Sequence, residues 1–333
     1  MKLLGVVYFI PLALLTPCLR AQCPSSLSEP LAVGLKIVHI PGGPKTVVWY
    51  PTRTAESSYE YSKLLHGLAA VQAPPRDCQR YPLVIFSHGL DGCGTQSVFI
   101  TEQLARAGYV VAAPDHRDAG CSSDGRGFVR WHLPKRSFLR PASWNEGTYL
   151  DRRRDLESVL NWMVTSPDFG RIIDGQHIAA AGHSLGGYAA LALAGGWESW
   201  RDPRIKAVLM FSPWVRPFAA QERLSAIHVP LMYQGAQLDL GMTPWIRGAR
   251  GIYSRSGEPK YYLELKAGTH LEWTNAVCLG HKTVASCVEK KSNARLIVDY
   301  STGFLDRYLK NAGELDQLSG AGLHSYLKAD RPH

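Results

Sequence analysis

The chain has 333 residues, of which 45% are hydrophobic and 20% are charged, and its formal net charge is +9. This composition is typical of a globular protein with a sizeable core. The basic residues are spread along the chain, and no basic stripe with interleaved aromatic residues indicates nucleic-acid binding. The densest basic run, residues 152–154, is interpreted as the solvated start of a helix.

The first residues have the pattern of a secretory signal peptide. Lys2 supplies a positive charge, residues 3–15 form an apolar run too short to span a bilayer, and Ala21 ends a small-residue cleavage site. We therefore expect residues 1–21 to be removed and the mature protein to be secreted or periplasmic. An uncleaved anchor and lipidation of Cys18 are the alternatives.

The elements that follow alternate between apolar runs and helical segments. Two β-rich runs at 35–39 and 46–50, joined by a Pro-Gly-Gly-Pro turn, suit an antiparallel hairpin. Further apolar runs lie at 82–86, 109–113, 177–181, 205–211, 231–233 and 261–265, and helical segments at 96–107, 152–164, 185–194 and 294–310. This order predicts an α/β fold, with a mostly parallel central sheet, helices on both faces and an N-terminal antiparallel hairpin.

We expect one domain over residues 22–310, because the sequence holds no internal repeat and no low-complexity linker. Residues 311–333 are predicted to be a polar C-terminal tail. Residues 116–148 have no clear periodicity and are rich in arginine and aromatic residues. A loop of this length in a compact domain is often functional.

A serine lies between the predicted strand at 177–181 and the helix at 185–194. Residues 182–186 read Gly-His-Ser-Leu-Gly, so Ser184 stands on a tight turn between two glycines. A strand, this motif and a helix together form a nucleophile elbow, which lifts the serine hydroxyl to the positive end of a helix. We predict that Ser184 is a catalytic nucleophile; a structural turn serine is the alternative.

A serine nucleophile needs a base that a carboxylate orients, in the chain order Ser, Asp or Glu, His. Asp239 follows the run at 231–233, and His270 follows the run at 261–265, so both are expected where parallel strands end. We predict Asp239 as the acid and His270 as the base. Asp202 and Asp115 are the rival acids, and His281 is a rival base in a loop flanked by cysteines.

The oxyanion that forms during acyl transfer needs backbone donors. One comes from the residue after the nucleophile, Leu185, and the second is expected from the loop after the run at 82–86, at Leu90. His88 in that loop is read as a brace for the loop, with a catalytic role as the alternative. No metal or cofactor is required for this chemistry.

Trp214 follows a predicted strand end, so its ring is expected at the mouth of the site as a substrate-binding residue. Covering the sheet edge is its alternative role. Aromatic and basic residues from the long loop are expected to join it: Phe128, Arg130, Trp131, Lys135, Arg136, Phe138, Arg140 and Trp144. Aromatic rings offer apolar area to an acyl or aryl group, whereas the cations oppose deep burial of a long chain.

On these motifs the chain resembles the dienelactone-hydrolase-like and platelet-activating-factor acetylhydrolase-like branch of the α/β-hydrolases, over residues 31–310. The matching pieces are residues 48–51, 86–90, 115–118, 182–187 and 268–270. The resemblance implies that the acid should follow the strand after the nucleophile helix, but residues 211–214 read Phe-Ser-Pro-Trp. An acid at Asp239 and a Pro-Trp pair are similar to cutinase-like polyester hydrolases and bacterial lipases.

The sequence therefore predicts a serine esterase that cleaves carboxylic esters of short to medium acyl chain, polyesters among the candidates. The alternatives are a lipase, a platelet-activating-factor acetylhydrolase-like phospholipase, and a binding protein on a hydrolase scaffold that has lost its chemistry. The expected partner is a small or polymeric ester, with no nucleic acid and no membrane segment after signal cleavage. The oligomeric state is left open, with a monomer as the default expectation.

The six cysteines that remain after signal cleavage are an even number for an exported chain, and none has zinc-site spacing. We expect Cys278 to pair with Cys287, which would steady the base, and Cys93 to pair with Cys121. Cys23 would then pair with Cys78.

Overall fold

The structure is a computed structural model that describes residues 31–125, 138–219, 223–313, 315 and 323–329. The predicted signal peptide lies outside these residues, as do Cys18 and Cys23. Part of the predicted aromatic and basic loop also lies outside them: Phe128, Arg130, Trp131, Lys135 and Arg136.

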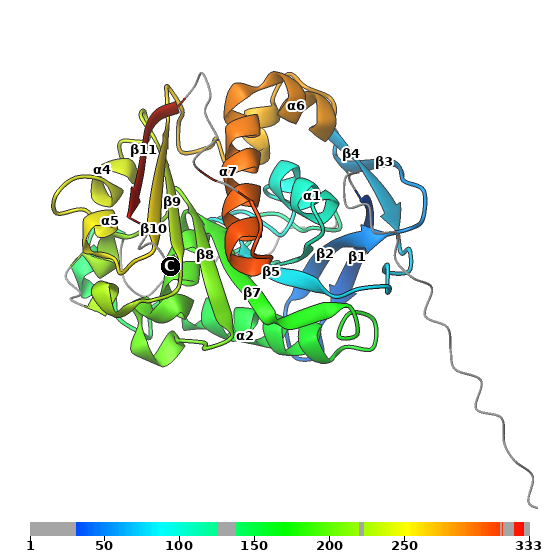
Figure 1. Cartoon of the computed structure of the whole chain (residues 1–333), viewed down its shortest axis with the longest axis horizontal. Helices are drawn as coiled ribbons and strands as arrows, with labels where there is room; N and C mark the ends of the chain where they lie inside the picture. The colour runs from blue at the N-terminus through cyan, green and yellow to red at the C-terminus, as the bar shows by residue number, and fades with distance from the viewer. Residues whose placement is uncertain (1–30, 126–137, 220–222, 314, 316–322, 330–333) are drawn as a thin grey trace, which may run out of the picture.

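Strands from the whole described chain form one mixed sheet (Figure 1). They are β1 (Ala32–His39), β2 (Lys45–Thr52), β3 (Ser57–Ser62), β4 (Leu65–Val71), β5 (Tyr81–Ser87), β6 (Val110–Pro114), β7 (Ile173–His183), β8 (Ile205–Phe211), β9 (Leu231–Ala236), β10 (Lys260–Leu265) and β11 (Leu323–Ala329). Their order is β11-β10-β9-β8-β7-β5-β6-β2-β1-β4-β3. The six strands from β6 to β10 in this order pair in parallel, and β1 and β2 form the predicted antiparallel hairpin.

The helices cover the sheet on both faces. They are α1 (Val98–Arg106), α2 (Leu150–Thr165), α3 (Leu185–Leu191), α4 (Thr243–Ile246), α5 (Ile252–Arg255), α6 (Val284–Lys290) and α7 (Ser292–Leu309). Figure 1 shows α7 running along the sheet with α1 and α6 beside it, and these helices belong to one core cluster. The helices α2 and α3 supply the cluster on the opposite face.

The sequence of β5 explains why both faces carry a core. Its side chains alternate, so Leu83 and Ile85 join the cluster under α2 and α3. Val84 and Phe86 join the cluster under α1 and α7. All four are buried, which is the pattern of a central strand that helices cover on both sides. The predicted α/β-hydrolase architecture is therefore confirmed.

Three strands, β3, β4 and β11, were not expected from the sequence, and two of them, β3 and β11, are the edges of the sheet. The polar β3 pairs with β4 at one end of the sheet, within what read as a connection. Within the predicted polar tail, β11 pairs antiparallel with β10, and Tyr326 packs on Tyr300 with ring centroids 5.2 Å apart. Edge strands such as these need only one paired side and one packed face, so their sequences carry little continuous hydrophobicity.

Two of the predicted disulfides are confirmed. Cys93 bonds to Cys121, which ties the loop after β5 to the loop after β6, and Cys278 bonds to Cys287 in the segment before α7. The predicted partner of Cys78, Cys23, lies outside the described residues.

Removing each disulfide should cost stability according to the loop that it closes. The Cys93–Cys121 link spans 28 residues and the Cys278–Cys287 link spans 9. Loop-closure entropy predicts a loss of about 3.5 kcal/mol for Cys93→Ala with Cys121→Ala and about 2.6 kcal/mol for Cys278→Ala with Cys287→Ala. Urea unfolding of both double variants measures this, and a change below about 1 kcal/mol in either would contradict the prediction.

Candidate active site

Ser184 occupies a strained turn between β7 and α3. Its φ is 53° and its ψ is −114°, a backbone conformation that residues other than glycine rarely adopt. A Cβ on Gly186 would collide with the carbonyl oxygen of Ser87, and one on Gly182 would collide with the backbone of Gly186. Glycine is therefore required on both sides of Ser184, as the motif predicts.

The structure brings Ser184, His270 and Asp239 together at the carboxyl ends of β7, β10 and β9. The Ser184 Oγ lies 3.0 Å from His270 Nε2, and His270 Nδ1 lies 3.0 Å from Asp239 Oδ2. Because the carboxylate accepts the proton on Nδ1, Nε2 is left as the acceptor of the serine hydroxyl. The Asp239 side chain is 4% exposed, whereas His270 is 31% exposed and open to the cavity.

The rival residues lie in other interactions. Asp115 accepts hydrogen bonds from the Gly94 and Ser123 amides, and Asp202 forms an ion pair with Arg204 at 2.6 Å. His281 lies 3.3 Å from the Ser286 hydroxyl. None of these rivals contacts Ser184 among the interactions of the described residues.

Ser212 lies beside Asp239 and His270. The sequence indicated its position after a strand but no role for it. It follows β8 with a φ of 42°, and its hydroxyl donates to Asp239 Oδ2. The Ser212 hydroxyl oxygen also lies 2.7 Å from His270 Nδ1. Ser212 therefore stands where the resemblance expects an acid, and it holds the Asp239 carboxylate against the imidazole. A polar residue directly after a central strand was the signal that could have identified it.

Leu90 and Leu185 both line the cavity beside Ser184. Leu185 is the first residue of α3, and Leu90 lies in the loop after β5. Among the described residues neither amide donates to another protein group, so both are free to hold an oxyanion.

Gln96 and His183 connect the two sides of the cavity. Gln96 accepts from the Gly89 amide at 2.9 Å and donates to His183 Nδ1 at 2.8 Å. His183 Nε2 donates to the His270 carbonyl at 2.9 Å. This chain of hydrogen bonds fixes the spacing between the loop that carries Leu90 and the loop that carries His270.

The cavity has a volume of about 540 Å³, and Trp214 forms part of its wall together with Phe138, Met242 and Leu271. The Trp214 and Phe138 rings lie 5.3 Å apart, with Trp144 behind them at 5.9 Å from Trp214. Trp214 is 6% exposed, so it lies in the wall rather than free at the mouth.

Across the described ranges, no group of three or more His, Cys, Asp or Glu side chains is arranged to hold a metal ion. In the same part of the chain, no helix has the length and apolar character needed to cross a membrane.

The fold and the arrangement of Ser184, His270 and Asp239 are those of an α/β-hydrolase. A family model of platelet-activating factor acetylhydrolase, isoform II, matches residues 65–125, and a model of PET hydrolase-like proteins matches residues 147–311. The chain has the fold of the α/β-hydrolases and is similar to their platelet-activating factor acetylhydrolases and cutinases.

Individual relatives agree with this family. Cutinase 2 of Thermobifida cellulosilytica is 27% identical over 200 residues, which cover 59% of this chain and 63% of that protein. Cutinase cut1 of Thermobifida fusca is 27% identical over 59% of this chain and 51% of its own length. Platelet-activating factor acetylhydrolase of Cavia porcellus is 25% identical over 51% of this chain and 44% of its own length. The chain thus spans less than two thirds of the length of these relatives.

Three buried histidines around the site make stability depend on pH. Burial lowers the pKa of His88, His116 and His183 to about 3, with Arg152 contributing at the first two and His270 at the third. Burial raises the pKa of Asp155, which lies 2.9 Å from His116, to about 7.

The free energy of unfolding should therefore fall as the pH falls below about 6. Between about pH 4 and 6 the unfolded chain binds protons on three histidines that stay neutral when folded, and the folded chain binds one more on Asp155. The difference of two protons predicts a loss of about 3 kcal/mol per pH unit. Urea unfolding at pH 7, 6 and 5 measures the slope; equal or higher stability at pH 5 would contradict it.

Proposed function

We propose that this chain is a secreted serine hydrolase that cleaves carboxylic esters of short to medium acyl chain. The observation that carries the proposal is the hydrogen-bonded series from Ser184 through His270 to Asp239, with both links at 3.0 Å. A serine hydroxyl is a weak nucleophile, and a base oriented by a carboxylate is what makes it reactive. Relatives named cutinase and platelet-activating factor acetylhydrolase support an ester as the substrate.

In this mechanism the Ser184 oxygen attacks the ester carbonyl while His270 Nε2 takes the hydroxyl proton. The resulting oxyanion accepts hydrogen bonds from the Leu90 and Leu185 amides. His270 gives its proton to the leaving alcohol, which leaves an acyl group on Ser184. A water molecule then attacks the acyl carbon with His270 as base, and the acid departs as Ser184 recovers its proton.

Asp239 and Ser212 act on the imidazole. Asp239 holds the proton on Nδ1 and stabilises the imidazolium that forms during each half-reaction. Ser212 donates to the same carboxylate oxygen, so it restricts the carboxylate to the orientation that faces His270. The acid therefore reaches the base from β9, and the serine at the end of β8 supports it.

The cavity wall supports a preference for short and medium acyl chains. Behind Trp214 the space is filled by a packed aromatic cluster in which Trp144 is 4% exposed and Tyr188 is fully buried. Among the described residues, this packing favours a short acyl group on that side. An apolar wall also suits an aromatic ring, so polyesters are included among the candidate substrates.

The second candidate is a phospholipase similar to platelet-activating factor acetylhydrolase, favoured by the family model over residues 65–125. A lipase and a binding protein that has lost the chemistry are the remaining alternatives.

Secretion is supported by the two disulfides, which persist in oxidising compartments.

Removing the nucleophile or the acid should abolish turnover without unfolding the chain. Ser184→Ala should lower kcat by ~10⁴ or more, and Asp239→Asn by ~10⁴ because the amide favours the wrong imidazole tautomer. Hydrolysis of a chromogenic acetyl ester measures both. A fluorophosphonate probe should label the wild-type protein at Ser184. Labelling at another residue would contradict the assignment of Ser184 as the nucleophile. No labelling would favour the alternative of a binding protein without catalytic activity.

Asp202→Asn is the matched control for the acid. Asp202 is held by Arg204 outside the site, so this variant should keep kcat within about twofold. If Asp202→Asn proved as damaging while Asp239→Asn stayed active, the acid would have been assigned to the wrong residue.

A series of chromogenic esters from acetyl to palmitoyl should give its highest kcat/KM at short or medium length. Trp214→Ala should raise KM roughly tenfold, equal to ~1.4 kcal/mol, because the acyl group loses an aromatic wall. Highest kcat/KM on palmitoyl esters with Trp214→Ala neutral would contradict this reading, and preferred cleavage of a short sn-2 phospholipid ester would favour the phospholipase.

A further inference from the structure

Arg152 lies directly behind the loop that carries Leu90. It belongs to the first turn of α2 and is completely buried, which corrects the expectation that residues 152–154 form a solvated helix start. Arg153 is only partly buried and Arg154 is exposed, so the expectation fails at Arg152 alone. A buried guanidinium must have partners for its donors, because an unpaired buried charge is costly.

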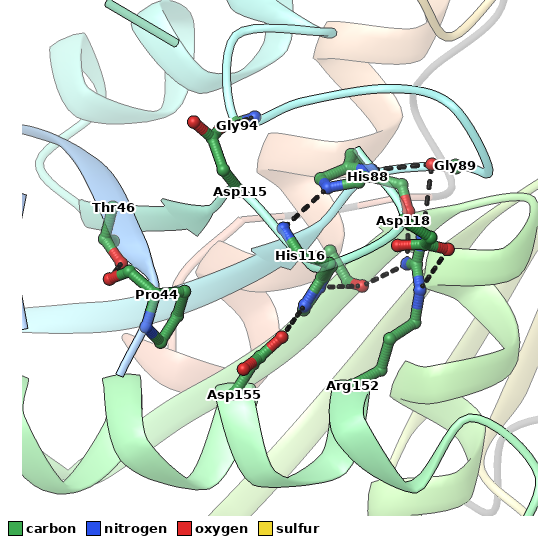
Figure 2. Close-up of polar contacts among 11 residues, drawn as sticks. Pro44, Thr46, His88, Gly89, Gly94, Asp115, His116, Asp118, Arg152 and Asp155 are labelled. Atoms are coloured by element: carbon green, nitrogen blue, oxygen red, sulfur yellow. Dashed lines mark hydrogen bonds and ion pairs between the residues drawn. The ribbon is translucent and has the colours of Figure 1, made fainter. Parts of the chain in front are cut away.

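The hydrogen-bond partners of the Arg152 side chain lie at the end of β5 and on the loops that follow β5 and β6 (Figure 2). Its Nε and Nη2 donate to Asp118 Oδ2 at 3.1 and 2.7 Å. Its Nη1 donates to the His88 carbonyl at 2.6 Å and to Ser87 Oγ at 3.1 Å, and its Nη2 donates to the Gly89 carbonyl at 3.2 Å. The side chain thus binds the backbone that leads from β5 to Leu90.

The Gly89 carbonyl has two further donors, the His88 side chain and the Gly92 amide. His88 Nδ1 lies 2.6 Å from that oxygen, while His88 Nε2 accepts from the His116 amide at 3.0 Å. The ring is therefore neutral with its proton on Nδ1, in agreement with the low pKa that burial gives it. The side chains of Arg152 and His88 (Figure 2) thus hold this carbonyl together with the Gly92 amide, which donates to it at 3.1 Å.

The geometry of the peptide bond carries this restraint to the cavity. The carbonyl of Gly89 and the amide of Leu90 belong to one planar trans peptide, in which the C=O and N–H point in opposite directions. With the oxygen held toward Arg152 and His88, the Leu90 N–H must point away from them. Leu90 lines the cavity beside Ser184, so this opposite side is the side of the reacting carbonyl.

Asp118 keeps the guanidinium in place. It is 1% exposed and lies 2.7 Å from Arg152 Nη2. Burial by itself raises the pKa of Asp118, but the charge and hydrogen bonds of Arg152, together with the neighbouring His88 and His116, more than offset burial and lower the pKa, so the pair stays charged on both sides. The two opposite charges of Arg152 and Asp118 cancel. The guanidinium also polarises the peptide between Gly89 and Leu90, which makes the Leu90 N–H a stronger donor.

We propose that Arg152 is a positioning residue of the oxyanion hole, which aims the Leu90 amide by holding the Gly89 carbonyl. The inference rests on the proposed function, since an oxyanion hole matters only if Ser184 attacks a carbonyl. Arg152 touches no reacting atom, so its removal should weaken stabilisation of the transition state and leave ground-state binding almost unchanged.

Arg152→Lys tests this role, because a lysine keeps the charge opposite Asp118 but cannot fork onto two carbonyls and a carboxylate at once. Arg153→Lys is the matched control, on the next residue of the same helix and in an ion pair with Glu157. We expect Arg152→Lys to lower kcat on an acetyl ester roughly 10- to 100-fold with KM within about threefold. Arg153→Lys should stay within about twofold in both constants.

A trifluoromethyl ketone gives a second readout, because it adds to Ser184 as a charged hemiketal that needs the oxyanion donors. Its inhibition constant should rise for Arg152→Lys by the same factor by which kcat falls. An unchanged kcat, or a fall in kcat/KM due to KM alone, would overturn the proposal. The proposed function fails separately, if Ser184→Ala retains the activity of wild type.

If thermal unfolding shows that Arg152→Lys does not fold, His88→Phe takes its place. This change removes the His88 donor to the Gly89 carbonyl while keeping a ring of similar size. A fall in kcat and a matching loss of ketone affinity, with KM kept, would support control of Leu90 through that carbonyl. Unchanged kcat in a folded His88→Phe would overturn it.

Discussion

The site depends on the close approach of two stretches of backbone, the end of β5 and the turn that carries Ser184. Gly186 lies so near the carbonyl of Ser87 that a side chain at that position has no space. This contact brings the amides of Leu90 and Leu185, which come from separate elements, to the same cavity. It also holds Ser184 at a positive φ, whose conformational cost of about 1–3 kcal/mol the surrounding packing must offset. Hydrogen bonds to Phe211 and from Trp214 contribute to that offset, because both involve the backbone of Ser184 itself.

Each side of this contact is supported by a buried polar network, in which Asp118 Oδ1 has no hydrogen-bond partner among the described residues. Gln96 and His183 join the oxyanion loop to the base loop, and Arg152 with Asp118 and His88 supports the same loop from behind. Side chains of this kind can hold a backbone in place only while their protonation is constant. The low pKa of the two histidines keeps them neutral at physiological pH, and the same burial makes the fold lose stability in acid.

The acid illustrates how a parallel sheet tolerates variation. The ends of β8 and β9 are neighbours, so a carboxylate on either can reach His270. Here Asp239 comes from β9 and Ser212 occupies the end of β8, and the two side chains meet on one carboxylate oxygen. The chain thus differs from the acetylhydrolase-like pattern in the position of the acid, and it keeps the geometry that orients the imidazole.

Local sequence patterns were sufficient to predict the elements that neighbouring residues in the chain determine. The apolar runs predicted the central strands, the Gly-His-Ser-Leu-Gly motif predicted the strained turn, and the order of strand ends pointed to Asp239 and His270. The edge strands β3 and β11 were not predicted, because an edge strand needs a partner more than it needs a hydrophobic run. The roles of Ser212 and Arg152 also required the tertiary structure, since hydroxyl and guanidinium groups gain their partners from loops 27 to 65 residues away. The sequence by itself therefore determined the α/β class and the three residues of the candidate site. Tertiary packing alone decided which polar side chains hold them, because burial and long-range contact leave no periodic signal in the chain.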